Sequence, residues 1–324
     1  MRVLSGITPS GECHLGNYFG AIRQHVELQE GNEAIFFMAD YHSMNSVRDG
    51  AERRRLVREV ALDYLACGLD PERAVLYRQS DLPELCELMW LLTTLTPMGL
   101  LERGHAYKDK VAQGQSADHG LFAYPVLMAA DILIYNPDVV PVGQDQKQHI
   151  EMCRDMAQRF NHTYGVELFE LPEPMILENV AVVPGTDGRK MSKGYDNTIR
   201  MFWPDKRLKK AVMSVVTDTT PVDQPKDTGQ PLFQLWSLFA SEGDRAEMWQ
   251  RAAAGGLGYG DVKKDLLARI LDAFGEMRAK REELARRPDD VEDVLRQGAE
   301  QARALAAPVV ASARAAAGVG PAPA

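Results

Sequence analysis

The chain has 324 residues, with 37 Lys and Arg against 46 Asp and Glu, so its formal net charge is −9 with histidine neutral. A hydrophobic fraction of 45% and a charged fraction of 26% are typical of a globular protein and argue against a disordered or fibrous chain. The acidic excess disfavours bulk nucleic-acid binding but allows a local basic patch. A length of this order predicts about two domains.

No segment of the sequence predicts membrane insertion or export. The most apolar stretch, residues 120–135, is interrupted by Pro125 and Asp131 and is shorter than the run of about 18 residues that a membrane span needs. Residues 1–7 form a strand-like run without a cleavable apolar segment, so we expect a cytoplasmic protein. The four cysteines form no CxxC pair, which argues against a zinc ribbon or a disulfide framework.

Short runs rich in Val, Ile, Leu and Phe predict buried strands in the first half of the chain. These runs span residues 2–7, 34–40, 74–78, 139–142 and 180–183. Helical periodicity covers residues 51–67, which end at Gly68, and a further helix is expected from Gln144 to about Asn161. Strands that alternate with helices predict an α/β fold with a parallel sheet.

The pattern changes after about Pro184. From Lys206 onward the sequence predicts helices, with an apolar stripe at residues 266, 267, 270, 271, 274 and 277. The alanine-rich segment 302–317 is expected to form a last helix, and residues 318–324 have too few apolar side chains to stay ordered. The second half is therefore predicted to be mostly helical.

The loop after the first strand is a candidate phosphate site. Thr8-Pro9-Ser10-Gly11 and then His14-Leu15-Gly16-Asn17 lead from a strand into a helix. Free backbone N–H groups and the positive end of a helix attract anions at such a turn. The loop matches neither GxGxxG nor a Walker A motif. Taken alone, a histidine at this place is more often a capping or packing residue.

A second candidate loop is Gly185-Thr186-Asp187-Gly188-Arg189-Lys190-Met191-Ser192-Lys193-Gly194. Its two lysines, three positions apart and flanked by glycines, can bring two ammonium groups to one polyphosphate. Phosphate displacement depends on such charge compensation more than on a covalent catalyst. An isolated pair of this kind is more often a solvated surface turn.

Two further elements complete a possible site. Tyr124, Met128 and Asp131 recur at i, i+4 and i+7 and so share one helical face. A carboxylate in such an apolar run needs a donor, either from the protein or from a ligand. Residues 140–149 again lead from a strand into a helix, where ligands of parallel sheets bind. Together the four elements predict an ATP-like polyphosphate site beside an apolar pocket with one acceptor.

The order of four motifs then identifies a family. The chain resembles the class I aminoacyl-tRNA synthetases, and within that class the bacterial tryptophanyl-tRNA synthetases, through HLGN at 14–17, MAADILIY at 128–135, VGQDQKQHIE at 142–151 and KMSKG at 190–194. The resemblance implies a Rossmann-like catalytic domain over residues 1–184. It also implies a KMSK loop with a helical anticodon-binding domain over 185–300, and a C-terminal helix with a tail over 301–324.

The implied activity is activation of L-tryptophan by ATP to tryptophanyl-adenylate and pyrophosphate, followed by transfer to tRNA(Trp). The resemblance further implies Mg²⁺ as an assisting ion and a homodimer. A tyrosyl-tRNA synthetase shares the architecture and also uses an Asp in its pocket, so it remains an alternative. A tryptophan- or RNA-binding paralogue with a regulatory or inhibitor-resistance role is the other. No metal ligands and no iron–sulfur cluster are expected, because clustered C-terminal cysteines are lacking.

The resemblance also assigns residues to roles. The implied catalytic residues are His14, Asn17, Lys190 and Lys193. The implied ATP-binding residues are Thr8, Ser10, Gly16, Asn17, Gly143, Asp145, Lys190, Met191, Ser192 and Lys193, with Lys108 or Lys110 as a further phosphate contact. The implied tryptophan-binding residues are Leu4, Gly6, His42, Tyr124, Met128, Asp131, Val140, Val142 and Gln146. Asp131 would accept the indole N–H, which penalises phenylalanine because that side chain has no donor.

Three positions depart from the usual pattern of the family. Thr8 replaces Gln, Gln144 replaces Glu, and Gly194 replaces Ser. The first two border the pocket and bear on inhibitor sensitivity and tryptophan affinity. Basic residues of the helical half are most often solvated, but the resemblance favours tRNA contacts for residues 206, 207, 209, 210, 263, 264, 278, 280 and 281.

Overall fold

A five-stranded parallel sheet organises the first half of the chain. The structure is a computed structural model that describes all residues except 105–106, 109–111, 113–117, 177–181 and 321–324. The strands are β1 Arg2–Ile7, β2 Glu33–Met38, β3 Ala74–Arg78, β4 Val139–Val142 and β5 Glu173–Ile176. They pair in the order β3-β2-β1-β4-β5. The strand order therefore reverses between β1 and β4, which is where ligands of such sheets bind.

The predicted α/β fold is confirmed, but the predicted fifth strand was wrong. The fifth strand is Glu173–Ile176; of the predicted range, residues 182 and 183 are not in a strand, and residues 180 and 181 lie outside the described residues. Val183 instead accepts a hydrogen bond from the Met191 N–H at 2.9 Å, so it supports the lysine loop. The sequence Glu-Pro-Met-Ile is short and polar at its start, as suits an edge strand, and a search for apolar runs passes over it.

Helices cover both faces of this sheet. Their bounds, with the turns that join them, are α1 Leu15–Asn17, the π-helical turn η1 Tyr18–Ile22, α2 Arg23–Leu28, α3 Asp40–Ser43, α4 Gly50–Ala66, η2 Gln79–Asp81, α5 Glu84–Thr93, α6 Met98–Leu101, α8 His119–Leu133, η3 Gln144–Gln146 and α9 Lys147–Tyr164. Phe36 packs in the core with α4, whereas its neighbour Ile35 packs on the opposite face with α8 and α9. This alternation follows from the two-residue repeat of a strand.

The second half is helical, as predicted. Its helices are α10 Asp205–Met213, α11 Pro231–Ser237, α12 Glu242–Ala254, α13 Tyr259–Ala285 and α14 Pro288–Ala316, with the 3₁₀ turn η4 Lys193–Tyr195 before them. Leu266, Ile270 and Phe274 of the predicted stripe are buried. The predicted start of the last helix was wrong, because α14 begins at Pro288 rather than Ala302. The charged residues of its first turns make the apolar face, which starts with Val291 and Leu295, difficult to recognise in the sequence.

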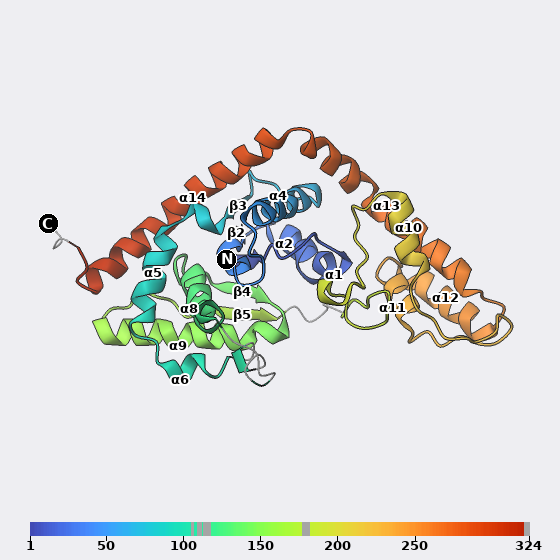
Figure 1. The fold of residues 1–324 in the computed structure, drawn as a ribbon, viewed down its shortest axis with the longest axis horizontal. Helices are drawn as coiled ribbons and strands as arrows, with labels where there is room; N and C mark the ends of the chain where they lie inside the picture. Colours follow the sequence, from blue (N-terminus) through green and yellow to red (C-terminus); the bar gives the residue numbers. More distant parts are fainter. Residues whose placement is uncertain (105–106, 109–111, 113–117, 177–181, 321–324) are drawn as a thin grey trace.

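Helix α14 returns from the helical half to the sheet. In Figure 1 it runs from beside α13 across β3 and α5 toward the C-terminus. A Cβ atom at Gly298 would lie 2.0 Å from the Leu76 carbonyl oxygen, so only glycine permits this close packing on β3. No helix in the described part of the chain is long and apolar enough to cross a lipid bilayer.

Aromatic contacts join the helical half to the helix that follows His14. Tyr18 packs edge to face against Phe274 with ring centroids 4.8 Å apart, and Phe19 packs against Phe239 at 5.3 Å. Such pairs add about 0.5–1.5 kcal/mol each to the burial of their area. The helical half is thus anchored directly behind the first candidate loop.

Candidate active site

A cavity of about 490 Å³ lies at the carboxyl edge of the sheet, between the ends of β1 and β4. All nine residues predicted to bind tryptophan line it, namely Leu4, Gly6, His42, Tyr124, Met128, Asp131, Val140, Val142 and Gln146. Thr8 and Gly143, predicted on the ATP side, line it as well. The volume suits a small-molecule ligand. The shared helical face predicted for Tyr124, Met128 and Asp131 therefore forms one wall of the cavity.

Asp131 is the acidic group of this cavity. Its side chain is 2% exposed and accepts hydrogen bonds from His42 Nε2 at 2.9 Å and from Gln79 Nε2 at 2.7 and 2.9 Å. Burial raises the pKa of the Asp131 carboxyl, and the His42 and Gln79 hydrogen bonds lower it. A carboxylate has about four lone-pair sites, so Asp131 keeps room for a ligand donor.

Gln79 is a functional neighbour that the sequence reasoning missed. It is fully buried, and its side-chain oxygen accepts the backbone N–H of Tyr41 at 3.0 Å. The residue therefore orients Asp131 and the turn that carries His42 at the same time. A signal was present, because Gln79 directly follows β3 at the carboxyl edge of the sheet, as the turn with His42 follows β2.

The side chain of Tyr124 is held by a residue of α9. Its hydroxyl lies 2.6 Å from Nε2 of His149, a buried residue of α9. Burial raises the pKa of the Tyr124 phenol, so the group stays protonated at neutral pH. It can thus donate to a ligand acceptor or to the imidazole.

His14 begins the helix after β1. Its backbone N–H donates to Asn17 Oδ1 at 3.1 Å, and the Leu15 N–H donates to the Ile199 carbonyl at 2.9 Å. Burial lowers the pKa of His14 to about 4, with smaller contributions from the charges of Lys193 and Arg200. The imidazole is therefore neutral at pH 7 and acts as a hydrogen-bonding group, not as a cation.

The structure brings the two candidate loops together. Lys193 Nζ donates to the Gly11 carbonyl at 2.8 Å, and burial lowers the pKa of this ammonium. Met191 is buried, and its Cβ would lie 3.6 Å from a Cβ atom at Gly16. Lys190 is exposed, so only one of the two lysines is docked in this structure.

Asn197 organises the lysine loop and was also missed. This buried amide accepts the Ser192 N–H at 2.8 Å and donates to the Asp187 carboxylate at 2.7 Å and the Lys190 carbonyl at 3.1 Å. A Cβ atom at Gly185 would lie 2.2 Å from the Asn197 amide nitrogen, so the loop requires glycine there. No periodicity signals a buried amide of this kind, because its partners belong to an irregular loop.

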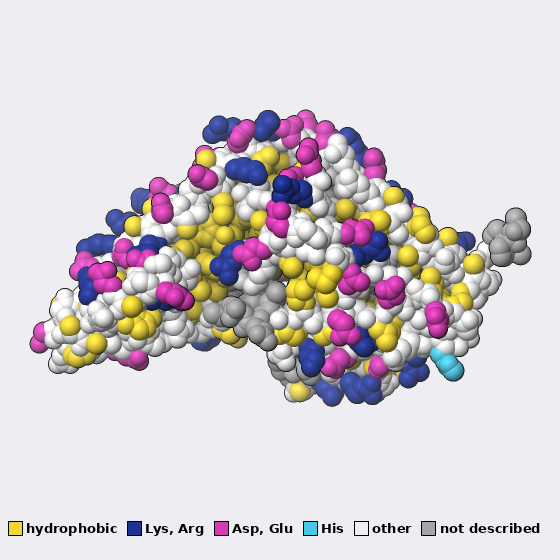
Figure 2. All heavy atoms as spheres, turned by 180° about the vertical axis from the view of Figure 1, so that it is seen from behind, with side chains coloured by type: hydrophobic (Ala, Val, Ile, Leu, Met, Phe, Trp, Pro, Cys, Tyr) yellow, Lys and Arg dark blue, Asp and Glu magenta, His cyan; other side chains and the backbone are white. Residues whose placement is uncertain are grey.

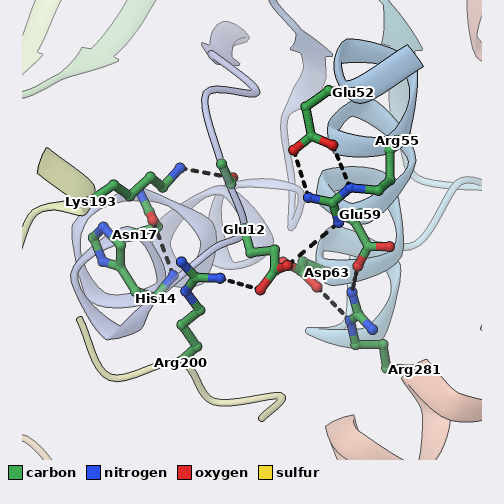
Figure 3. Close-up of polar contacts among 11 residues, drawn as sticks. Glu12, His14, Asn17, Glu52, Arg55, Glu59, Asp63, Lys193, Arg200 and Arg281 are labelled. Carbon is green, nitrogen blue, oxygen red and sulfur yellow. Dashed lines mark hydrogen bonds and ion pairs between the residues drawn. The ribbon is translucent and has the colours of Figure 1, made fainter. Parts of the chain in front are cut away.

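A network of ion pairs ties this region to α4 and α13 (Figure 3). Glu12 lies between Arg200, with which it forms an ion pair, and Arg55 of α4 at 3.5 Å. Further along α4, the Asp63 carboxylate pairs with Arg281 of α13 at 2.6 Å, and Glu59 pairs with the same guanidinium. Burial raises the pKa of Asp63 to about 6, and Arg281 opposes the shift.

The β1–α1 loop lies between the cavity and the lysine loop, because it lines the cavity and also accepts the hydrogen bond from Lys193. Gly6 and Thr8 line the cavity, whereas His14, Asn17, Lys190 and Lys193 do not. The remaining predicted ATP residues Ser10, Gly16 and Ser192 belong to the two loops. The side chain of Asp145 and all of Lys110 lie outside the described residues, and Lys108 is exposed. The geometry is therefore a partly open, mostly apolar cavity with the docked lysine loop on the far side of the β1–α1 loop.

Comparisons with known proteins agree with this geometry. The family model for tRNA synthetases class I (W and Y) matches residues 1–275. The Tryptophan--tRNA ligase of Fusobacterium nucleatum subsp. nucleatum is 53% identical over 305 residues, or 94% of each chain, and that of Rhodopirellula baltica is 54% identical over 97% of this chain and 98% of the relative. The crystal structure of tryptophanyl-tRNA synthetase from Campylobacter jejuni complexed with ADP and tryptophan superposes with a TM-score of 0.92 at 47% identity, covering 98% of this chain and 100% of that one.

Proposed function

Because the chain belongs to the class I tRNA synthetases of the tryptophan and tyrosine group, we propose that it activates L-tryptophan with ATP and joins it to tRNA(Trp). The first step forms tryptophanyl-adenylate and releases pyrophosphate. In the second step a hydroxyl of the terminal ribose of the tRNA attacks the tryptophanyl-adenylate. An ester bond to the ribose forms, and AMP leaves. One observation carries the proposal: nine residues from distant parts of the chain line a single apolar cavity with one buried carboxylate.

Asp131 selects the amino acid in this proposal. The indole N–H donates to its carboxylate, which His42 and Gln79 hold in place. Leu4, Val140 and Val142 form apolar walls, while Tyr124 and Gln146 hold the substrate ammonium and carboxylate groups. A site that leaves a buried acceptor unpaired discriminates strongly against a side chain without a donor. Phenylalanine is therefore excluded by chemistry rather than by size alone.

The two loops hold ATP. Neutral His14 and Asn17 hydrogen-bond to the phosphates, and Gly16 allows close approach of the nucleotide. Lys193, with Lys190, neutralises charge that develops on the departing pyrophosphate, as fixed cations do in phosphoryl chemistry. Thr8, Ser10, Gly143, Asp145, Met191 and Ser192 complete the adenosine and phosphate contacts. The docking of Lys193 on Gly11 supports this assignment, because it places the ammonium beside the turn that leads to His14.

Mg²⁺ enters this proposal as a partner of the phosphates. Within the described residues, no group of three or more His, Cys, Asp or Glu could hold a metal ion. In this proposal the ion arrives bound to the phosphates of ATP. It would neutralise charge on the phosphate oxygens.

The helical half binds tRNA in this proposal. Residues 1–184 act as the catalytic domain, residues 185–300 as the lysine loop and anticodon-binding domain, and residues 301–324 as the C-terminal helix and tail, although α14 continues across residue 300. Basic and acidic side chains are interspersed over the face in Figure 2, so no single field marks the site. Arg278 and Arg281 already pair with Asp205 and Asp63, which favours the exposed Lys206, Arg207, Lys209 and Lys210 of α10 as tRNA contacts.

A homodimer in the cytoplasm is the last part of the proposal. Trp90 and Met98 are 67% and 63% exposed and border a small cavity of about 180 Å³ with Cys86 and Met89 on α5 and α6. Exposed apolar patches of this kind mark interfaces. Trp90→Glu should convert a dimer into a monomer in analytical ultracentrifugation. An unchanged mass would contradict a dimer interface at this patch.

Amino-acid-dependent exchange of pyrophosphate into ATP tests the function. The protein is mixed with ATP, Mg²⁺ and tryptophan, tyrosine or phenylalanine in turn. Exchange should depend on tryptophan, and charging of a tRNA(Trp) transcript should follow. Exchange with tyrosine alone would assign the tyrosine branch of the family. Tryptophan binding without exchange or charging would indicate a paralogue with a regulatory role.

A further inference from the structure

A second cavity, of about 500 Å³, opens beyond the carboxyl ends of β2 and β3. Its walls come from α3, the first half of α4, η2 and the start of α14. It shares no lining residue with the tryptophan cavity, although the same turns separate the two. Asp40 and Tyr41 face the second cavity, whereas Ala39 and His42 face the first. The proposed function uses no residue of the second cavity.

The carboxylates of this second cavity are already paired. Asp40 accepts the Ser80 N–H at 2.9 Å and the Ser80 hydroxyl at 2.6 Å. Asp81 accepts from Arg78 at 2.9 Å, and Glu292 of α14 accepts from the same guanidinium at 3.0 Å. Arg78 supplies one positive charge against the two carboxylates that it contacts, and no cation in the described structure pairs with Asp40. Two of the three negative charges are therefore left for further cations to balance.

Three arginines of α4 supply that further charge. Arg53, Arg54 and Arg58 line the cavity, and none of them pairs with a carboxylate among the residues that the structure describes. Arg53 donates through Nη2 to the Val47 carbonyl at 2.7 Å, while its Nε is buried and has no acceptor in the described structure. An unpaired buried donor is costly unless a ligand satisfies it. With Arg78, the cavity thus has four positive charges against three carboxylates, an excess of one, and the Nε of one guanidinium has no acceptor in the described structure.

We propose that this cavity binds a phosphate group, carried by a free nucleotide or by the backbone of a nucleic acid. Guanidinium groups bind phosphate oxygens in bidentate pairs, and three of them converge here. The apolar side chains Val57 and Leu295 offer a surface for the uncharged part of the ligand. The location fits the rule that parallel sheets bind ligands at their carboxyl edge.

The second cavity touches the first through a hydrogen-bonded wall. Asp40 holds Ser80 in η2, and the next residues in each turn, Tyr41 and Gln79, are joined by their own hydrogen bond. Gln79 in turn holds Asp131 of the tryptophan cavity. A phosphate in the second cavity therefore orders the turns that carry His42 and Gln79.

Calorimetric titration with inorganic pyrophosphate tests the proposal. The titration uses the Lys190→Ala/Lys193→Ala protein, so that the lysine loop does not contribute. This protein should still bind pyrophosphate, and adding Arg53→Gln with Arg58→Gln should weaken binding at least tenfold. Arg286→Gln with Arg296→Gln removes two exposed arginines elsewhere and should leave binding unchanged. Because only binding is measured, the result does not depend on the proposed reaction.

Two outcomes would overturn the proposal: no pyrophosphate binding to the double-lysine protein, or equal binding with and without the two arginines. If the glutamine variants fail to fold by circular dichroism, Arg53→Lys with Arg58→Lys keeps the charge but loses the planar fork. This pair should weaken binding at least threefold, and unchanged binding would count against the site.

The source of the phosphate follows from two further titrations of the Arg53→Gln/Arg58→Gln protein with its lysines intact. A nucleic-acid source predicts weaker binding of a tRNA transcript and a salt slope smaller by about 1 to 2. A free-nucleotide source predicts unchanged tRNA binding and the loss of one ATP site.

Discussion

The proposed function assigns the tryptophan cavity and the lysine loop to one reaction, but the two regions are built in opposite ways. The cavity is part of the core, and its carboxylate Asp131 is fixed by two side-chain donors. The lysine loop exposes Lys190, and it is held by the buried Asn197, by the Met191 N–H on Val183 and by one bond from Lys193 to a backbone carbonyl. A rigid slot suits selection, whereas a loosely held cation suits a charge that appears only in the transition state. Binding and chemistry should therefore be separable by mutation.

Lys193→Ala should give the largest difference between the effect on the reaction and the effect on tryptophan binding. Removing one preorganised charge from a transition state costs about 10²- to 10³-fold in rate, or roughly 3–4 kcal/mol. We expect tryptophan-dependent pyrophosphate exchange to fall by this factor, because Lys193 is the docked lysine. The dissociation constant for tryptophan, measured by calorimetry, should change less than twofold.

The exposed Lys209 of α10 supplies the matched control for that experiment. Lys209→Ala removes the same group outside the loop and should leave exchange unchanged. An equal loss of tryptophan affinity and exchange in Lys193→Ala would contradict the separation of the two regions.

Asp131→Ala should impair the selection of the amino acid by the tryptophan cavity. Tryptophan should lose about 100-fold in kcat/KM relative to phenylalanine, since loss of a hydrogen bond to a charged group costs about 1.5–3 kcal/mol. His42 and Gln79 also lose their acceptor, so the free energy of unfolding should fall by about 2–4 kcal/mol. Exchange assays with both amino acids and urea denaturation measure the two effects. Unchanged selectivity would show that another group recognises the indole.

The sequence predicts the cavity better than the loop. Tyr124, Met128 and Asp131 lie on one regular helix, where helical spacing places side chains on one face without knowledge of the rest of the fold, whereas Leu4 and Val140 were assigned by the family resemblance. Gln79 escaped because a polar residue at a strand end is not distinctive by itself. The contact between Asp131 and its donors requires two elements to pack, and no single segment encodes it.

From the residues alone, the loop could be predicted only as a pair of lysines flanked by glycines, and the roles of its residues came from the family resemblance. Asn197, the residue that holds it, is buried among irregular backbone, and its partners are set by tertiary packing. Glu12 and Arg200 are separated by 188 positions and show no pattern that would pair them. The start of α14 was misplaced for a related reason, since a charged first turn conceals a helix that is recognised by its apolar stripe.

Asn197→Ala tests whether the amide positions the lysines. The variant loses one acceptor and two donor contacts within the loop, so the exchange rate should fall about tenfold and the unfolding free energy by about 1–2 kcal/mol. Tryptophan affinity should not change, because Asn197 does not line the cavity. Asn197→Asp keeps the acceptor for Ser192 but places a second carboxylate against Asp187, so it should not recover the rate if the donor contacts position the loop.

The smallest expected effect is the contribution of His14 to the pH dependence of the free energy of unfolding. Its pKa is lowered to about 4, from the ordinary value of 6.5, first by burial and then by Lys193 and Arg200. Between these values the unfolded chain binds a proton that the folded chain does not bind. The free energy of unfolding must therefore fall as the pH falls through this window. Solvent near the loop screens part of the effect, so we expect a loss of about 1 kcal/mol between pH 6.5 and 4.5.

The comparison of the wild-type protein with His14→Gln isolates this contribution, because all other titrating groups remain in both proteins. Urea denaturation at several pH values should show the wild-type protein losing stability relative to the variant as the pH falls. His119→Gln removes an exposed ring and should leave the pH profile unchanged. A pH-independent difference between wild type and His14→Gln would mean that the imidazole is not shielded by the docked lysine loop. The surface loop would then be open in solution, and the contrast between a rigid slot and a loosely held cation would be greater than the structure implies.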